Sequence, residues 1–205
     1  NLILRFNEPV AKGNDAAKTI SLVRSVVPTI TNGSLTGNVA TLTFSSNPGF
    51  VVGDKITTTG CSTTAFNVTG STNEVGTGGQ ITAVNGSTVS FAKTNADIAL
   101  AALTGCTYSA TRTNGTTNLI TTSEVISSNS DELTIGNFPN DNRATVNPLG
   151  VMLFGVAYHV LISAGAIVDK AATPNPFAAI SSTAFWSFTT GTDTVAPTLN
   201  VATSD

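Results

Sequence analysis

Apolar and polar residues alternate along most of this chain, and the alternation predicts β-strands. Every second residue is apolar in 2–6 and again in 158–162. A period of two places these apolar side chains on one face of a strand. Near the end of the chain, Trp186 and Phe188 share such a face, so we expect Trp186 to be buried.

Turn-forming residues separate the predicted strands. The dipeptides at 32–33 and 85–86 are both Asn-Gly, which is the strongest short signal for a β-hairpin. Gly53 begins a Gly-Asp turn and is expected to have a positive φ. By contrast, residues 95–103 have a helix-like spacing, with Asn95 as the N-cap, and predict one or two helical turns.

The local composition of the sequence divides the chain into two units. From about residue 31 to residue 111 the chain is especially rich in Gly, Ser, Thr and Asn, and after residue 112 the composition of the first 30 residues returns. We therefore predict an all-β protein, in which residues 1–30 and 112–192 form a β-sandwich. Residues 31–111 form an inserted small domain, a β-barrel or β-roll. Such an insertion is tolerated because a domain that folds alone adds little loop-closure entropy.

Charged residues are scarce: they make up 10% of the chain, and the formal net charge is −3. Hydroxyl and amide side chains supply the polarity instead, a profile typical of extracellular or virion-surface β proteins. Because Lys and Arg form no run, nucleic acid is not an expected partner. No apolar stretch reaches the roughly 20 residues that a membrane helix requires, so no membrane span is predicted.

No catalytic motif is found. His159 is the sole histidine, and we expect it to face solvent in a strand without the nucleophile and acid of a triad. Asp131 and Glu132 are adjacent carboxylates, but they lie in a predicted turn. Residues 76–80 are Gly-rich without the strand-to-helix context of a phosphate loop, and predict a hairpin tip. We expect that the chain is not an enzyme.

The two cysteines, Cys61 and Cys106, leave two interpretations open. They are either two buried free thiols or the two ends of a disulfide. The extracellular type of composition favours the disulfide.

Both ends of the chain carry motifs of a known family. Residues 1–13 read NLILRFNEPVAKG, and residues 158–199 read YHVLISAGAIVDKAATPNPFAAISSTAFWSFTTGTDTVAPTL. Together these segments, within 1–30 and 112–199, resemble the Ig-like repeats of bacterial surface-layer proteins and giant adhesins. The resemblance implies an Ig-like β-sandwich, with residues 193–205 as the linker and the first strand of a following repeat.

The inserted domain has a resemblance of its own. Residues 34–110 contain the stretches GFVVGDKI and STVSFAKT, and they are similar to small β modules of phage tail and virion proteins. The resemblance implies a compact β module that can serve in a virion.

A calcium site is one expectation that follows from the adhesin resemblance. In related repeats, calcium stiffens the junction between domains. Glu8 ends the first strand, Asp169 begins a loop and Asp193 lies at the hinge, so these carboxylates could meet at one pole of the sandwich. The alternative is that all three are solvated loop acids, and no other cofactor is expected.

Three functions remain open. The first is a non-enzymatic structural or adhesive module of a large extracellular bacterial surface protein, a rod repeat whose insert projects to make contacts. The alternative is a virion structural protein, such as a tail fibre, knob or decoration domain. The third is a carbohydrate-binding accessory module, which the content of one Trp and two Tyr disfavours because sugar platforms need exposed aromatic rings.

The last residues suggest an assembly strand. The chain opens on a strand with no opening strand before it and continues past its closing strand into Thr198, Leu199, Asn200 and Val201. A vacant sheet edge and a spare strand favour pairing between chains, so we expect residues 197–205 either to pair with a neighbouring molecule or to lie disordered. Expected partners are therefore neighbouring repeats or chains, joined head-to-tail, together with a cell-surface or glycan ligand.

Overall fold

The computed structural model describes residues 2–68, 79–112, 117–137 and 141–191. The prediction of an all-β fold with a sandwich is confirmed. Within these ranges the backbone forms antiparallel sheets and a single turn of 3-10 helix, η1 (Thr64–Phe66), with no α-helix.

Three groups of strands form the part that we call the sandwich. One sheet has the order β1-β14-β13, and the other has the order β12-β3-β15-β17. A two-stranded ribbon, β2 with β16, closes the far end. The bounds are β1 (Leu2–Arg5), β2 (Val10–Lys12), β3 (Thr19–Arg24), β12 (Ser123–Ser127), β13 (Leu133–Ile135), β14 (Arg143–Val146), β15 (Ala157–Ile162), β16 (Ile167–Asp169) and β17 (Ser187–Thr189).

The core of the sandwich follows from the alternation in β3 and β15, where every second residue is buried. Tyr158 is the largest fully buried side chain. Its hydroxyl donates to the carbonyl of Ile120 at 2.9 Å and accepts the N–H of Leu153 at 3.0 Å. Its ring stacks on Phe188 across β15 and β17, with ring centroids 6.0 Å apart. Tyr158 thus fixes two loops around the core.

The remaining strands form the inserted unit, with sheet orders β7-β8-β5-β4-β9 and β11-β10-β6. An isolated bridge between Lys55 and Gln80 connects the two sheets along one edge. The bounds are β4 (Ile30–Thr36), β5 (Val39–Phe44), β6 (Lys55–Thr59), β7 (Ile81–Asn85), β8 (Thr88–Ala92), β9 (Ile98–Ala102), β10 (Thr107–Arg112) and β11 (Thr117–Asn118).

The turns predicted at Gly53 and at Asn85-Gly86 are confirmed, whereas the turn predicted at 32–33 is wrong. Gly86 and Ser87 connect β7, which ends at Asn85, to β8, and Gly53 has a φ of 95°. Residues 32–33, however, lie inside β4. The hairpin between β4 and β5 turns instead at Gly37 and Asn38, whose φ values of 57° and 63° suit a tight two-residue turn.

The predicted helix at 95–103 is also wrong, because the segment contains β9, which pairs with β4. Nine residues are too few to hold a helix without tertiary support. Asp97 instead accepts the N–H of Gly37 at 2.9 Å, which ties the segment to the β4–β5 turn. Leu100 is 68% exposed, so the apolar spacing did not mark a buried helix face.

Two further expectations concern exposure. Trp186, expected to be buried, is only half-buried, because it precedes the short edge strand β17 and reaches one side of the core. His159 lies half-buried on the outer face of β15, so its expected exposure to solvent is only partial.

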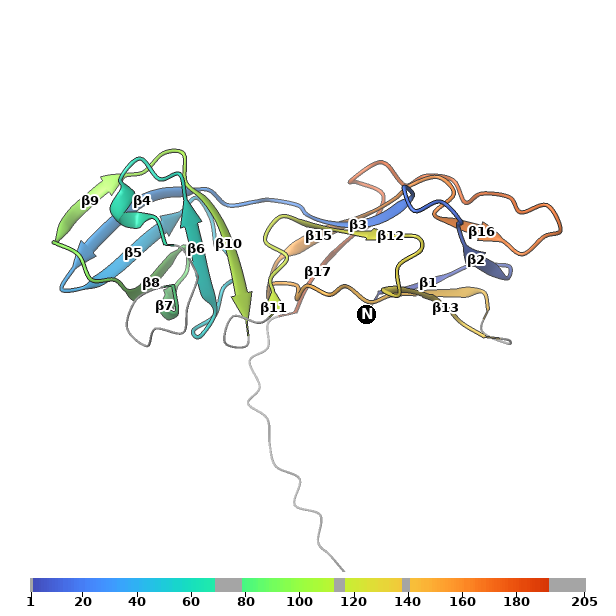
Figure 1. The fold of residues 1–205 in the computed structure, drawn as a ribbon, viewed down its shortest axis with the longest axis horizontal. Coiled ribbons are helices and arrows are strands. Elements are labelled where there is room, and N and C mark those ends of the chain that lie inside the picture. Colours follow the sequence, from blue (N-terminus) through green and yellow to red (C-terminus); the bar gives the residue numbers. More distant parts are fainter. Residues whose placement is uncertain (1, 69–78, 113–116, 138–140, 192–205) are drawn as a thin grey trace, which may run out of the picture.

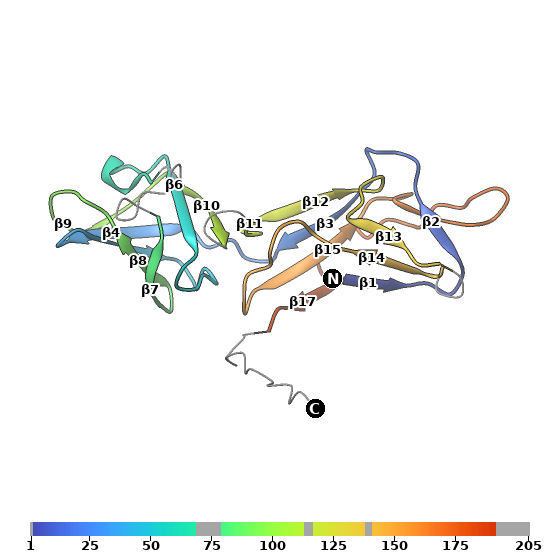
Figure 2. The same cartoon turned by 60° about the horizontal axis from the view of Figure 1, so that its bottom comes forward.

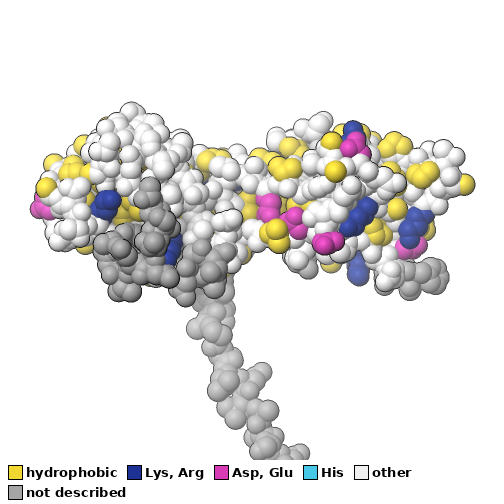
Figure 3. Space-filling view, in the orientation of Figure 1, with side chains coloured by type: hydrophobic (Ala, Val, Ile, Leu, Met, Phe, Trp, Pro, Cys, Tyr) yellow, Lys and Arg dark blue, Asp and Glu magenta, His cyan; other side chains and the backbone are white. Residues whose placement is uncertain are grey.

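Figures 1 and 2 show the sandwich and the inserted unit side by side along the longest axis of the molecule. In the space-filling view, most of the visible surface is neither charged nor hydrophobic (Figure 3). No helix in the described part of the chain is long and apolar enough to cross a membrane.

Candidate functional site: the joint between the two β units

The joint is the place where the inserted unit meets the sandwich. A loop at residues 46–50, between β5 and β6, approaches the sandwich loop at 153–156, which precedes β15. The two loops approach closely at Gly49: a Cβ atom there would lie 2.7 Å from Val156 Cγ2 and 3.2 Å from the carbonyl oxygen of Phe154. Its φ of 79° also favours glycine. The two loops therefore pack without space for a side chain at this position.

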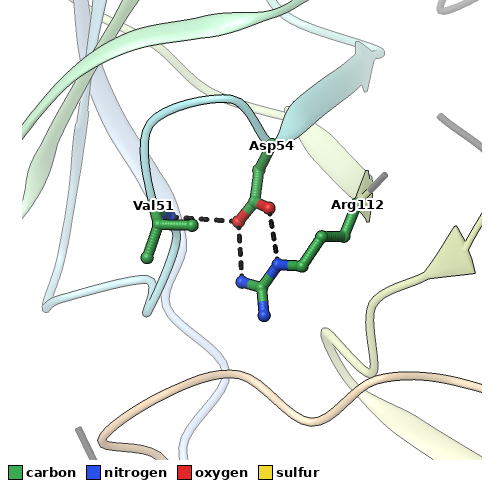
Figure 4. Close-up of polar contacts among 3 residues, drawn as sticks. All are labelled: Val51, Asp54 and Arg112. Carbon is green, nitrogen blue, oxygen red and sulfur yellow. Dashed lines mark hydrogen bonds and ion pairs between the residues drawn. The ribbon is translucent and has the colours of Figure 1, made fainter. Parts of the chain in front are cut away.

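A partly buried ion pair of the inserted unit lies near the joint (Figure 4). Arg112, the last residue of β10, donates from Nε and Nη2 to the two carboxylate oxygens of Asp54 at 2.8 and 3.0 Å. The Asp54 side chain is 1% exposed and also accepts the N–H of Val51 at 3.0 Å. Such bidentate geometry is the strongest form of an Arg–carboxylate contact.

The same guanidinium reaches across to the sandwich. Its central carbon lies 4.8 Å from the ring centroid of Phe154, in the geometry of a cation–π contact. Arg112 therefore links the Asp54 turn of the inserted unit to the sandwich loop.

Arg24 is another residue that connects the two units. It ends β3 on the same face as Ile20 and Leu22, and only 4% of it is exposed. Its Nη2 donates to the carbonyl oxygen of Asn47 in the inserted unit at 3.3 Å. Burial lowers the pKa of Arg24 and raises the pKa of both nearby phenols, Tyr108 and Tyr158.

An aromatic cluster supports the joint from within the inserted unit. Phe44, Phe50 and Tyr108 meet edge to face, with centroids 5.2 to 6.0 Å apart. Edge-to-face contacts hold rings in one relative orientation. The cluster thus fixes the base of the loop that carries Asn47 and Gly49.

The structure joins Cys61 and Cys106 in a disulfide, the alternative that the composition favoured. Thr107, which follows Cys106, is the register partner of Thr59 in the β6–β10 pair. The tripeptide Thr-Gly-Cys occurs twice in the sequence, at 59–61 and 104–106, a repeat that could have indicated the pairing.

The predicted calcium ligands are only partly brought together. Glu8 and Asp169 border one groove of about 260 Å³ at the far end of the sandwich, whereas Asp193 lies outside the described residues. The described part of the chain holds no group of three potential ligands. Calcium binding at this pole stays a prediction.

Asp169 has a local role in its loop. Its carboxylate accepts two hydrogen bonds from Asn175, at 2.7 and 2.8 Å, and one from the N–H of Ala171 at 3.2 Å. The bonds from the Asn175 side chain and backbone lower the pKa of Asp169 because they stabilise its charged form. The same oxygens would have to serve calcium as well.

The other predicted sites stay untested. The assembly strand Thr198, Leu199, Asn200 and Val201 lies outside the described residues. The Gly-rich hairpin tip at 76–80 falls mostly outside them too. The edges of two sheets end at β1 and β17, where a further strand could pair.

The sequence reasoning missed the joint altogether. Arg24 could have been noticed, because it is a charged residue at a position where the alternation of β3 predicts a buried apolar side chain. The pairing of Asp54 with Arg112 could not have been noticed, since 58 positions separate the two residues in the sequence.

A comparison of the chain with models of known protein families, with curated proteins and with solved structures found no match.

Proposed function

We propose that this chain is a non-enzymatic structural and adhesive module of a large extracellular bacterial surface protein. In this proposal the sandwich is one repeat of a rod, and the inserted unit projects from it to make contacts. The observation that carries the proposal is the joint, where Gly49 brings the two units into close contact. A contact unit held at a fixed angle loses less conformational freedom when it binds.

The topology of the insertion supports a role in a rod. The inserted unit leaves the sandwich after β3 and returns before β12, and these two strands are paired neighbours, with Val23 opposite Ser123. Tension along the sandwich therefore does not reach the inserted unit until this pair separates. A binding surface on the unit would keep its shape while the rod carries load.

The disulfide supports an extracellular location. Disulfides persist in oxidising compartments and are rare in the cytosol. The scarcity of charged residues in the chain agrees with a surface built from hydroxyl and amide groups.

Adhesion by the inserted unit can be measured with coated beads. One set carries the full chain, and the other carries a variant in which residues 27–118 are replaced by a short Gly-Ser turn, so that Ile120, the partner of Tyr158, is kept. Beads are washed under flow over mucin, collagen and an epithelial cell layer. We expect retention of the full-chain beads on at least one surface and loss of the variant beads.

Circular dichroism checks that the variant is folded: the β-sheet signal of the sandwich should be retained. Equal retention of both bead types contradicts a role for the inserted unit. Retention of neither on any of the three surfaces contradicts the adhesive function.

A further inference from the structure

Two arginines lie opposite each other on the outer face of the sandwich. Arg5 of β1 and Arg143 of β14 are register partners, and β1, β14 and β13 lie side by side in one sheet (Figure 2). Their side chains point away from the core, because Ala144, the residue after Arg143, is buried in it. Like charges directly opposite each other on neighbouring strands destabilise a sheet. The pair therefore costs stability unless an anion compensates it.

No carboxylate in the described part of the chain pairs with either arginine. The ion pairs there are Arg112 with Asp54 and Lys170 with Asp141. Asp141 is the acid nearest to Arg143 along the sequence, and its carboxylate lies 3.2 Å from the Lys170 ammonium group. The two positive charges thus remain without a counter-charge among the described residues.

Both guanidinium groups are open to a ligand at their tips. Nε of Arg143 is buried and has no hydrogen-bond partner among the described residues, whereas its two Nη groups are neither buried nor hydrogen-bonded there and reach solvent. Arg5 is exposed. The Cβ atoms of such cross-strand partners lie about 4.5–5.5 Å apart. One anionic group above the sheet can therefore contact Arg5 and the Nη groups of Arg143 together.

The adjoining row of the same face carries no charge. It consists of Ile3 of β1, Thr145 of β14 and Thr134 of β13. Ile3 is 49% exposed, Thr134 is exposed and Thr145 is half-buried. Threonine hydroxyls both donate and accept hydrogen bonds. A sugar ring has hydroxyl groups at its edge and an apolar C–H face, so this row suits a sugar that carries the anionic group.

We propose that this face binds an acidic glycan, a polysaccharide whose sugars carry carboxylate or sulfate groups. Arg5 and the Nη groups of Arg143 bind one such group in the forked geometry that arginine favours, and Thr145 and Ile3 contact the sugar. The contact lies on the sandwich, whereas the adhesive contact proposed above lies on the inserted unit, so neither proposal depends on the other. A site of two arginines is weak by itself and adds to the contact of the inserted unit.

The test measures binding of the full chain to glycans immobilised on a biosensor, at physiological ionic strength. Polygalacturonate supplies carboxylates, dextran sulfate supplies sulfates, and unmodified dextran is the neutral control. We expect binding to at least one of the two acidic glycans and none to dextran. The comparison of the two acidic glycans identifies the anionic group that the site favours.

Variants separate the site from a general effect of charge. Arg5→Gln and Arg143→Gln should each weaken binding about tenfold, because charge-assisted hydrogen bonds are lost. Lys55→Gln removes the same charge from β6 of the inserted unit and should bind like the wild type. The double variant Arg5→Lys, Arg143→Lys keeps both charges without the fork and should bind more weakly than the wild type.

The folding of these variants is checked by their Tm. Arg5→Gln and Arg143→Gln should each have a Tm at least equal to that of the wild type, because a pair of like charges has been removed. A loss of binding is then not a loss of folding. If either Gln variant is destabilised, the Lys double variant, which keeps the long basic side chains, decides.

The proposal is overturned if the full chain binds neither acidic glycan, or if the Gln variants and the Lys double variant bind as tightly as the wild type. It is also overturned if Lys55→Gln weakens binding as much as Arg5→Gln, since the effect is then one of net charge. Polyglutamate is the last probe. If it binds through the two arginines as tightly as the acidic glycans do, the partner is an acidic peptide and the assignment to a glycan is wrong.

Discussion

At the scale of single residues, the Asp54–Arg112 pair is the strongest polar contact of the joint. Both Asp54 oxygens are engaged, and its side chain is almost fully buried. An ion pair in such a place stabilises less than its geometry suggests, because both charges lose their hydration. The loss of stability is large when only one partner is removed, because the other charge is then left without its counter-charge.

We expect Asp54→Ala to lower the free energy of unfolding by about 3 kcal/mol, since Arg112 is left partly buried without its partner. Urea denaturation followed by fluorescence measures the loss. The double variant Asp54→Ala, Arg112→Met should recover part of it, because no unpaired charge remains.

A surface ion pair of the same chain provides the control. Lys170 lies 3.2 Å from Asp141, and its side chain is 45% exposed. Lys170→Ala should cost less than about 1 kcal/mol. A loss from Asp54→Ala no larger than that from Lys170→Ala contradicts the argument.

At the scale of the element, the loop at 46–50 determines how closely the two units approach. Gly49→Ala places a methyl group against Val156 and the backbone of Phe154, in addition to the cost of a positive φ. We expect a looser joint, seen as a larger radius of gyration in small-angle X-ray scattering and as independent tumbling of the two units in NMR relaxation.

The cost of the positive φ alone is measured with Gly86→Ala. Gly86 has a φ of 59°, and a Cβ atom there would meet nothing within 4 Å. This variant should lose some stability while keeping the scattering profile and tumbling of the wild type. Similar changes in both variants would mean that Gly49 does not control the joint.

Elements were predictable from the sequence where local pattern and local chemistry agreed. The alternation in β3 and β15 predicted buried faces, and the Asn-Gly at 85–86 predicted a turn. The turn predicted from the same dipeptide at 32–33 is wrong, because strand β4 continues beyond these residues and the chain turns only at Gly37. Turn propensity is local, whereas the end of a strand depends on its partner.

The joint could not be predicted for a related reason. Its contacts join residues far apart in the sequence, such as Arg24 with Asn47 and Arg112 with Phe154. The alternation of apolar and polar residues predicts which face of a strand a residue lies on, but it does not predict which loop packs against the end of that face. The change of composition near residues 31 and 111 predicted two units, but it gave no information about how they pack against each other.

At the scale of the whole molecule, the insertion and the disulfide together predict an order of unfolding under force. The chain is held by its two ends in an optical trap and pulled. The sandwich should open first, because the paired strands β3 and β12 shield the inserted unit from tension. The inserted unit should follow as a separate, later step.

The length of that second step depends on the disulfide. The roughly 100 residues between β3 and β12 release about 33 nm when the thiols are reduced, at about 3.3–3.6 Å for each extended residue. With the Cys61–Cys106 disulfide intact, the sequence separation of 45 residues stays closed and the step shrinks to about 18 nm. A long step that precedes opening of the sandwich, or a step unaffected by reductant, would contradict this order. Shielding of the inserted unit is what a rod repeat with a projecting contact domain requires, because the rod can then stretch before the contact surface is lost.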